Sequence, residues 1–395
     1  MNRLVIKFGG SSVATIDKIK AVAKVIIDRK KDYEQIVAVV SAMGKTTNGL
    51  IQMANDLSAY PAEREMDMLL ATGEMVSASL LSIYLQSIGE KSVALTGFQA
   101  GFETIGSHQV SKISNVITDR LIKELNDGKI VVVTGFQGMN ENGDFTTLGR
   151  GGSDTSAVAI AAVLKARCEI LTDVNGIYTV DPRIRKTAKK IDYISYQETM
   201  EMANLGAKVI EPRSVEMALR YDVPLFIGLN TGDLNGTNII KEEDIVEQNI
   251  ITNISNKNDV LLVKIFKKGS NEFGISEALK QLAQNDINID MINTIVEENA
   301  VGYKITTNLV SKNKTKQVLD EMGLDCEFKE NLSKVSIIGS AMRNQVGVAA
   351  RAFDILSKES VPFYEVSTSE ISISYLVDES KSNKLVNAFA DEFNL

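Results

Sequence analysis

The 395-residue sequence contains one histidine, two cysteines and no tryptophan. With His108 as the single histidine, a Ser-His-Asp triad or a metal site of several histidines would have to use that residue or is absent. Cys168 and Cys326 lie far apart without a CxxC spacing, which excludes a disulfide scaffold or a cysteine-rich zinc site and favours a reducing cytoplasm. We therefore expect the chemistry to come from carboxylates, lysines and backbone donors.

The chain also lacks an excess of positive charge and long apolar runs. Its 43 basic and 51 acidic residues give a net charge of -8, which argues against general binding to nucleic acid or anionic lipid. Apolar runs such as 157–164 fall far short of the roughly 20 residues that span a bilayer, and the N-terminus has no secretory-signal pattern. Five prolines and no low-complexity tract argue against extended disorder. The length predicts two or three globular domains.

Short apolar strands alternate with helices in residues 1–245. Strands are predicted at 4–8, 35–40, 91–95, 130–134, 169–172 and 223–228, and helices at 17–30 and 153–165. This alternation predicts an α/β domain with a mainly parallel central sheet sandwiched by helices. Ligands of such sheets bind beyond the carboxyl ends of the strands, where the loops described below are expected.

The C-terminal part of the chain has a different composition and a weak internal repeat. Charged residues and asparagine dominate up to residue 259, which predicts a linker at 246–259. Residues 260–330 and 331–395 each show a strand, a glycine-containing loop, a helix and two further strands. This pattern predicts two copies of a small α/β unit, with coincidence between generic segments as the alternative.

Two loops that follow predicted strands are candidates for ligand binding. Lys7 ends one strand and is followed by the glycine-rich residues 8–12, so backbone N–H groups, a helix start and an ammonium can meet an anion there. The loop 41–47 offers the hydroxyl groups of Ser41 and Thr47. A tight turn with a surface lysine, and a solvated polar loop, are the structural alternatives.

The stretch 147–155 is the most informative part of the sequence because three glycines surround one arginine. Arg150 suits bidentate binding of a carboxylate, and the glycines after it allow a substrate close to the backbone. Asp154 opens the next helix, where it either orients nearby lysines or caps the helix. Capping does not explain the glycines around the arginine, so we favour a binding role.

Other candidates carry weaker signals. Glu74 either pairs with a ligand ammonium or, as we slightly favour, is an acid near a helix start that is satisfied by the helix dipole. Residues 172–183 form either a nucleotide-binding lip, with Arg183 near phosphate, or a long turn. Lys208 beside a small-residue turn is a candidate second phosphate-binding charge. His108 has no partner pattern and is interpreted as a loop or surface residue.

In this order, the motifs resemble the amino-acid kinase family and, within it, the aspartokinases. The matching stretches are 7–13, 40–47, 72–74, 134–138, 147–155 and 172–183. The resemblance implies a catalytic amino-acid kinase domain at 1–245, followed by two ferredoxin-like βαββαβ ACT domains at 260–330 and 331–395. It also implies ATP-dependent phosphorylation of the β-carboxylate of L-aspartate to 4-phospho-L-aspartate, the first step of lysine, methionine, threonine and diaminopimelate biosynthesis.

The resemblance also implies roles for single residues. The catalytic set would be Lys7, Asp154 and Lys208. ATP would contact Lys7, Phe8, Gly9, Gly10, Ser11, Thr172, Asp173, Tyr178, Asp181, Arg183, Lys208 and Val209. L-Aspartate would contact Ser41, Thr47, Glu74, Arg150, Gly151, Gly152 and Ser153. The Mg²⁺ that accompanies ATP would be held mainly by phosphates and water, so no protein metal cluster is required.

The region that resembles ACT domains departs from the family pattern. Phe273-Gly274 stands where relatives carry Pro-Gly, and Thr294-Ile295 where a Gln-Asn pair contacts the amino-acid effector. Lost side-chain amides remove hydrogen bonds for an effector such as lysine or threonine, so we expect altered, weak or absent feedback inhibition. The effector candidates are Gly274, Ile275, Asp290, Thr294, Gly347, Ser367 and Thr368. The ACT pair is expected to form a homodimer or a larger oligomer.

Two rival functions stay open at this point. One is a different amino-acid kinase, acting on glutamate, acetylglutamate, carbamate or a nucleotide. The other is an amino-acid sensor with an inactive kinase half. The repeat at the C-terminus and the stretch 147–154 disfavour the first rival, and joint retention of Lys7, Arg150 and Asp154 disfavours the second.

Overall fold

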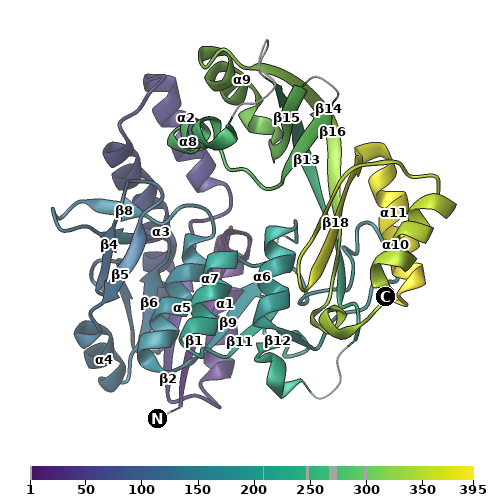
Figure 1. Ribbon diagram of the computed structural model, residues 1–395. Helices are drawn as coiled ribbons and strands as arrows, with labels where there is room; N and C mark the ends of the chain where they lie inside the picture. Colours follow the sequence, from purple (N-terminus) through teal and green to yellow (C-terminus); the bar gives the residue numbers. More distant parts are fainter. Residues whose placement is uncertain (1, 208, 246–248, 267–273, 298–299) are drawn as a thin grey trace. The chain divides into compact units, whose positions relative to one another are not determined.

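The structure, a computed structural model, describes residues 2–207, 209–245, 249–266, 274–297 and 300–395. The chain divides into two compact units (Figure 1). The first contains residues 1–178, 190–203 and 208–247, and the second contains 179–189, 204–207 and 248–395.

The first unit is built on an eight-stranded sheet in the order β10-β12-β11-β9-β1-β2-β6-β3. Every neighbouring pair is parallel except β11 with β12, which confirms the predicted mainly parallel sheet. The continuous β-branched runs of the central strands are buried on both faces, as such a sheet requires. The strands are β1 Arg3–Phe8, β2 Gln35–Val40, β3 Ser92–Leu95, β6 Ile130–Thr134, β9 Arg167–Thr172, β10 Tyr193–Ser195, β11 Leu225–Leu229 and β12 Thr237–Ile240.

Helices cover both faces of this sheet. Apolar residues of α1 (Ile16–Arg29) and α3 (Glu63–Ser87) form one core with β1, β2 and β6. Helix α5 (Gly152–Leu164) packs on β1 and on α7 (Pro212–Arg220). The remaining helices of this unit are α2 Thr46–Leu57, α4 Asp119–Asn126 and α6 Tyr196–Asn204. The predicted helix-covered sheet is therefore confirmed.

A second, four-stranded sheet in this unit was not predicted. Its order is β5-β4-β7-β8, with β4 at Phe102–Ile105, β5 at Lys112–Val116, β7 at Gln137–Met139 and β8 at Phe145–Thr147. The last residue of β8 leads directly into the glycine-rich stretch before α5. This small sheet therefore fixes where that stretch begins.

The second unit contains a six-stranded antiparallel sheet in the order β14-β15-β13-β16-β18-β17. Two similar runs of strand, helix and paired strands confirm the predicted repeat. The strands are β13 Asn253–Phe266, β14 Ile292–Glu297, β15 Ala300–Asn308, β16 Asp325–Ile338, β17 Phe363–Thr368 and β18 Ser372–Asp378. The helices are α8 Ile275–Gln284, α9 Lys312–Glu321, α10 Val348–Lys358 and α11 Glu379–Glu392.

The structure corrects the predicted domain boundaries. Strand β13 begins at Asn253, inside the segment predicted as a linker, because its residues 253–257 pair in register with 334–338 of β16. Strand β16 runs across the predicted boundary between residues 330 and 331, and residues 179–189 belong to the second unit. Polar composition suggested a linker, but backbone pairing in a sheet does not depend on apolar side chains.

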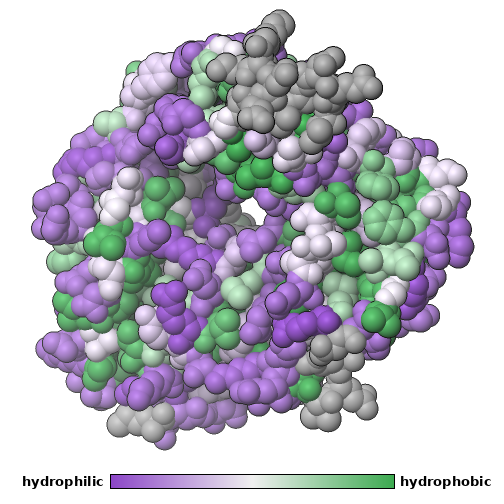
Figure 2. Space-filling view, in the orientation of Figure 1, coloured by the Kyte–Doolittle hydropathy of each residue, from purple (hydrophilic) through white to green (hydrophobic). Residues whose placement is uncertain are grey.

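Helix α3 is, within the described part of the chain, the one helix long and apolar enough to cross a membrane. Half of its apolar stretch is buried inside the structure, and the helix carries the buried acids Asp67 and Glu74. A core helix of a globular domain passes the same test of length and composition. On the face that Figure 2 shows, apolar residues form small groups among hydrophilic ones.

Candidate active site

The candidate site of the first unit lies at the carboxyl ends of its central parallel strands. The chain runs from β1 to β2 and β6 on one side, and then returns through α5 to β9 on the other side of β1. The strand order therefore reverses at β1, which is where open α/β sheets bind ligands. The loops after β1, β2, β6 and β9 all open at this edge.

A close ion pair joins the first strand to the start of helix α5. Lys7 Nζ lies 2.6 Å from Asp154 Oδ1, and the two side chains are only 12% and 10% exposed. The cap of α5 is Gly151, without a side-chain cap hydrogen bond, so the structural alternative for Asp154 is wrong. Its carboxylate instead holds an ammonium group at the carboxyl end of the sheet, beside a helix N-terminus that favours anions.

The glycine loop after β1 packs tightly against the loop after β2. A Cβ on Gly10 would lie 2.7 Å from the carbonyl oxygen of Ala42, so a larger residue would push the two loops apart. The N–H of Gly44 donates to the carbonyl of Gly10 at 2.9 Å. A Cβ on Gly9 would lie 3.6 Å from Lys7 Nζ, so the lysine ammonium and the glycine backbone occupy the same place. Phe8 is fully buried and Ser11 is exposed.

Two predicted substrate hydroxyls meet beside the ion pair. Ser41 Oγ donates to Ser153 Oγ at 3.0 Å, and the carbonyl of Ser41 accepts from Ser77 Oγ at 2.7 Å. A Cβ on Gly135 would come 2.7 Å from Ser153 Cβ, so this glycine, at the end of β6, lets α5 approach. Thr47 lies half-buried in the first turn of α2.

Glu74 is a buried acid with free bonding capacity, which differs from the interpretation that we slightly favoured. It lies in the middle of α3, not near its start, and is 3% exposed. Its Oε1 accepts from the backbone N–H of Ala42 at 3.0 Å, whereas Oε2 has no hydrogen-bond partner among the described residues. Burial raises the pKa of Glu74 to about 7. A ligand ammonium group is the kind of partner that would restore its charge.

Arg150 projects from a loop that glycines hold in place. It is exposed, between Gly149 and Gly151, whose φ angles are 78° and 67°. A Cβ on Gly151 would lie 2.5 Å from Glu211 Cβ, and a Cβ on Gly152 would lie 2.8 Å from Leu148 Cβ. Close packing therefore requires glycine at these positions, and the loop leaves the Arg150 guanidinium exposed, where it can reach a ligand.

The predicted nucleotide residues are divided between the two units. Thr172 ends β9, the neighbour of β1, and Asp173 follows it; Thr172 Oγ1 donates to Asp173 Oδ1 at 3.1 Å. Tyr178 and Val209 also belong to the first unit. Asp181 and Arg183 belong to the second unit, where Arg183 Nη2 lies 2.6 Å from Asp181 Oδ2 and lowers the pKa of that carboxyl. Lys208 lies outside the described residues.

Asn230 directly follows β11 and lies at the edge of the candidate site. The sequence did not indicate it. Its N–H donates to the carbonyl of Thr172 at 2.8 Å and its Nδ2 donates to Ser12 Oγ at 2.9 Å. It therefore joins the loops that follow β1, β9 and β11. A single asparagine after a strand carries no motif that would have identified it.

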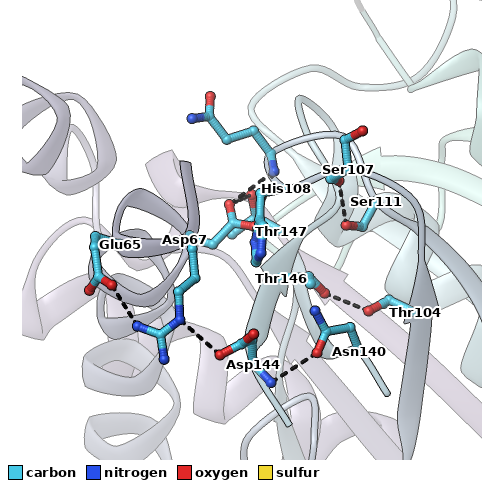
Figure 3. A network of polar contacts seen from close by, with 12 residues as sticks. Glu65, Asp67, Thr104, Ser107, His108, Ser111, Asn140, Asp144, Thr146 and Thr147 are labelled. Carbon is cyan, nitrogen blue, oxygen red and sulfur yellow. Dashed lines mark hydrogen bonds and ion pairs between the residues drawn. The ribbon is translucent and has the colours of Figure 1, made fainter. Parts of the chain in front are cut away.

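His108 lies in a loop, as predicted, and it has a partner that no local sequence pattern indicated. Its Nδ1 lies 2.7 Å from Oδ2 of Asp67, which is fully buried on α3 (Figure 3). Thr147 Oγ1 donates to Asp67 Oδ1 at 2.6 Å. The residues are 41 and 80 positions from Asp67 along the chain. No local sequence pattern could have paired them.

The predicted effector residues all lie in the second unit. Gly274 and Gly347 precede α8 and α10, Thr294 is exposed on β14, and Ser367 and Thr368 lie on β17. Ile275 is the half-buried first residue of α8. The carboxylate of Asp290 pairs with Lys334, which is only 3% exposed.

Two family models match separate parts of the chain. The model of the amino acid kinase family matches residues 2–228, and a model of the ACT domain matches residues 335–393. The first match covers most of the eight-stranded sheet, without β12, and includes Lys7, Glu74 and Asp154. The second covers the last part of the six-stranded sheet.

Individual relatives indicate a subgroup within this family. Aspartokinase 2 of Bacillus subtilis is 44% identical over 402 residues, covering 100% of this chain and 98% of that protein. E. coli aspartokinase III with aspartate and ADP superposes with a TM-score of 0.84 at 24% identity, covering 99% and 100% of the two chains, which shows a shared fold. The same enzyme with lysine and aspartate has a TM-score of 0.77 at 25% identity, with 99% of each chain covered. The chain belongs to the amino acid kinase family and, within it, to the aspartokinases.

Proposed function

We propose that the chain transfers the γ-phosphoryl group of ATP to the β-carboxylate of L-aspartate, giving 4-phospho-L-aspartate and ADP. The observation that carries the proposal is the Lys7–Asp154 ion pair at the point where the strand order reverses, between glycine loops. Full-length similarity to aspartokinases supports the choice of acceptor. Both the geometry of the ion pair and the full-length similarity are independent of amino-acid composition.

The inventory of residues agrees with a reaction that needs no protein base. A carboxylate acceptor is already ionised and nucleophilic at neutral pH, since its reference pKa is near 4. The single histidine contacts Asp67 and is not among the residues of the candidate site beside Lys7. Catalysis then depends on alignment and on neutralising charge as the phosphoryl group moves, a role that suits Lys7.

The acceptor amino acid is held at three points in this proposal. Arg150 binds its α-carboxylate through a bidentate pair, and Glu74 binds its ammonium group. Ser153 accepts from Ser41 at 3.0 Å and donates to a carboxylate of the acceptor, next to the N-terminus of α5. The backbone of Gly151 and Gly152 and the hydroxyl of Thr47 complete the pocket.

The nucleotide lies against the glycine loop after β1. Phe8, Gly9, Gly10 and Ser11 supply the backbone, while Lys7 and Lys208 supply charge to the phosphates. Thr172, Asp173, Tyr178 and Val209 complete the wall within the first unit, and the nucleotide contacts predicted for Asp181 and Arg183, which belong to the second unit, stay predictions.

Mg²⁺ is expected to arrive with ATP. In the described residues, no cluster of three His, Cys, Asp or Glu side chains could hold a metal ion alone. The donor set beside Lys7, which is one paired carboxylate with hydroxyls and backbone amides, fits an ion held mainly by phosphate oxygens and water. When bound, the ion would neutralise phosphate charge.

The test is ADP release that depends on L-aspartate, with the acyl phosphate trapped as a hydroxamate. A panel with glutamate, acetylglutamate and carbamate separates the proposed activity from other amino acid kinases. ADP release that needs no acceptor, or needs a different one, would reject the proposal. No turnover with aspartate binding intact would instead support a sensor.

We also infer regulation and assembly through the ACT pair. The expected assembly is a homodimer or a larger oligomer, with lysine or threonine as the effector class and weak inhibition because Thr294 replaces an amide. Initial rates with lysine, threonine and methionine, together with light scattering, test both parts. Strong inhibition by sub-millimolar lysine would contradict the expectation of weak control. We expect the enzyme to work in the cytoplasm, at the entry to amino-acid biosynthesis.

A further inference from the structure

One buried carboxylate joins three separate parts of the kinase unit. Asp67, on α3, is fully buried. The backbone N–H of Gln109 lies 3.1 Å from each of its two oxygens, Thr147 Oγ1 donates to Oδ1 at 2.6 Å, and His108 Nδ1 lies 2.7 Å from Oδ2 (Figure 3). Because an ionised carboxylate only accepts, His108 must carry a proton on Nδ1. The carboxylate thus connects α3, the loop 107–111 and the end of β8.

A carboxylate charge in a fully buried position is energetically costly unless hydrogen-bond donors satisfy the lone pairs of its oxygens. An ionised carboxylate without solvent needs several donors, and removing one donor leaves the remaining charge poorly compensated. The three elements are therefore held in one mutual arrangement rather than in several.

The elements that Asp67 joins lead directly into the loop that carries Arg150. Thr147 is three residues before Arg150, and its carbonyl accepts from the N–H of Ser111 at 3.0 Å. A Cβ on Gly149 would lie 3.1 Å from the carbonyl oxygen of Gln109. Arg213 donates to the carbonyls of Leu148 at 3.3 Å and Ser111 at 3.0 Å. The loop 107–111 is thus the support against which residues 148–149 lie.

The same helix carries the other proposed contact for the acceptor amino acid. Glu74 follows Asp67 by seven residues, which is about two helical turns and places both on one face of α3. Both side chains are buried, at 0% and 3% exposure. Helix α3 therefore holds Glu74 directly and the Arg150 loop through Asp67.

We propose that Asp67, with His108 and Thr147, is a positioning residue that fixes the Arg150 loop relative to Glu74 and so sets affinity for the acceptor amino acid. The proposal rests on the proposed function, in which Arg150 and Glu74 bind the α-carboxylate and the ammonium group. Asp67 itself touches neither ligand. A purely structural role would lower stability without favouring one substrate.

The chain offers a closely matched pair of variants for this test. Thr147→Val removes the hydroxyl that donates to Asp67, whereas Thr146→Val removes a neighbouring hydroxyl of β8 that lies 2.6 Å from Thr104 Oγ1. Both threonines are 1% exposed. His108→Leu removes the other side-chain donor, and His108→Asn can place an amide N–H near the position of Nδ1.

The expected result is a split between the two substrates in steady-state kinetics of the full chain. Thr147→Val and His108→Leu should raise the KM for L-aspartate about tenfold and change the KM for ATP less than about twofold. That tenfold corresponds to about 1.4 kcal/mol, close to the lower end of the range of about 1.5–3 kcal/mol for a hydrogen bond to a charged group. Thr146→Val should change neither KM more than about twofold, and His108→Asn should recover most of the affinity. Equal effects of Thr146→Val and Thr147→Val would overturn the proposal.

A measurement without substrate separates failure of this inference from failure of the proposed function. Amide hydrogen exchange over residues 148–152 should become faster in Thr147→Val and His108→Leu, but not in Thr146→Val. If the wild type shows no aspartate-dependent ADP release while the exchange pattern appears, the positioning part stands and the acceptor is wrong. Unchanged exchange in both Asp67-partner variants rejects the positioning role whatever the activity.

Discussion

Replacing Glu74 by glutamine tests the most unusual electrostatic feature of the proposed site. The substitution keeps the side-chain shape and an oxygen that can accept from the N–H of Ala42. It removes the ability to ionise and places an amide NH2 group where Oε2 lies. The unperturbed pKa is 4.5, and burial raises the pKa of Glu74 to about 7 in the folded protein.

The size and sign of the effect follow from this difference in pKa. Because the pKa is higher in the folded than in the unfolded state, Glu74 stabilises the fold fully below about pH 4.5, and this contribution is lost as the pH rises to about 7. The interval from 4.5 to about 7 corresponds to about 3 kcal/mol at 1.36 kcal/mol per pH unit. Glu74→Gln should therefore gain stability relative to the wild type as the pH rises, by at most that amount.

The assay is thermal unfolding of the ligand-free chain at several pH values from about 5 to 8. From about pH 5 to about 7 the difference changes by about 2.5 kcal/mol, so at about 2–4 °C per kcal/mol the variant should gain about 5–10 °C in Tm relative to the wild type. The control is Glu63→Gln, an exposed glutamate of the same helix, for which the difference should stay constant. Comparing variants at each pH cancels the titration of all other groups.

A kinetic counterpart compares the wild type with Glu74→Gln. In the wild type, the KM for L-aspartate should fall as the pH rises through about 7, because Glu74 must ionise to hold the ammonium group, whereas Glu74→Gln should show a high and flat KM. Parallel Tm profiles for wild type and Glu74→Gln would refute the buried, protonated carboxyl. If Glu74→Gln gains Tm as predicted but keeps the wild-type KM for L-aspartate, Glu74 does not bind the substrate.

Three further variants test the ion pair, the guanidinium and the glycine loop. Lys7→Met should abolish measurable turnover in ADP assays. It should also lower the free energy of unfolding in denaturant melts by about 3 kcal/mol, because Asp154 is left as a buried charge without its partner. The double variant Lys7→Met with Asp154→Asn should recover stability but not turnover. Arg150→Gln should raise the KM for L-aspartate about 30-fold or more at unchanged Tm, and a normal KM would exclude its role. Gly10→Ala should raise the KM for ATP, whereas Gly49→Ala, where a Cβ meets nothing within 4 Å, should not.

Much of the fold could be predicted because local physics dominates it. Strands 35–40 and 130–134 were predicted with the bounds that the structure shows, since continuous β-branched runs suit a strand buried on both faces. The apolar helix at 153–165 and the repeat after residue 260 follow from periodicity. The short strands β7, β8, β10 and β12 were not predicted, because three or four residues carry too little pattern.

By itself, the sequence determined which chemical groups are available: a lysine and glycines after the first strand, an arginine among glycines, and one histidine. Only tertiary structure decided what those groups do, because burial and partners come from residues distant in the chain. Asp154, at the start of α5, pairs with Lys7 of β1. Glu74 is a buried carboxyl with a raised pKa and not an acid at a helix start, and His108 contacts Asp67. Desolvation and long-range hydrogen bonds act between elements, so no window of sequence contains them.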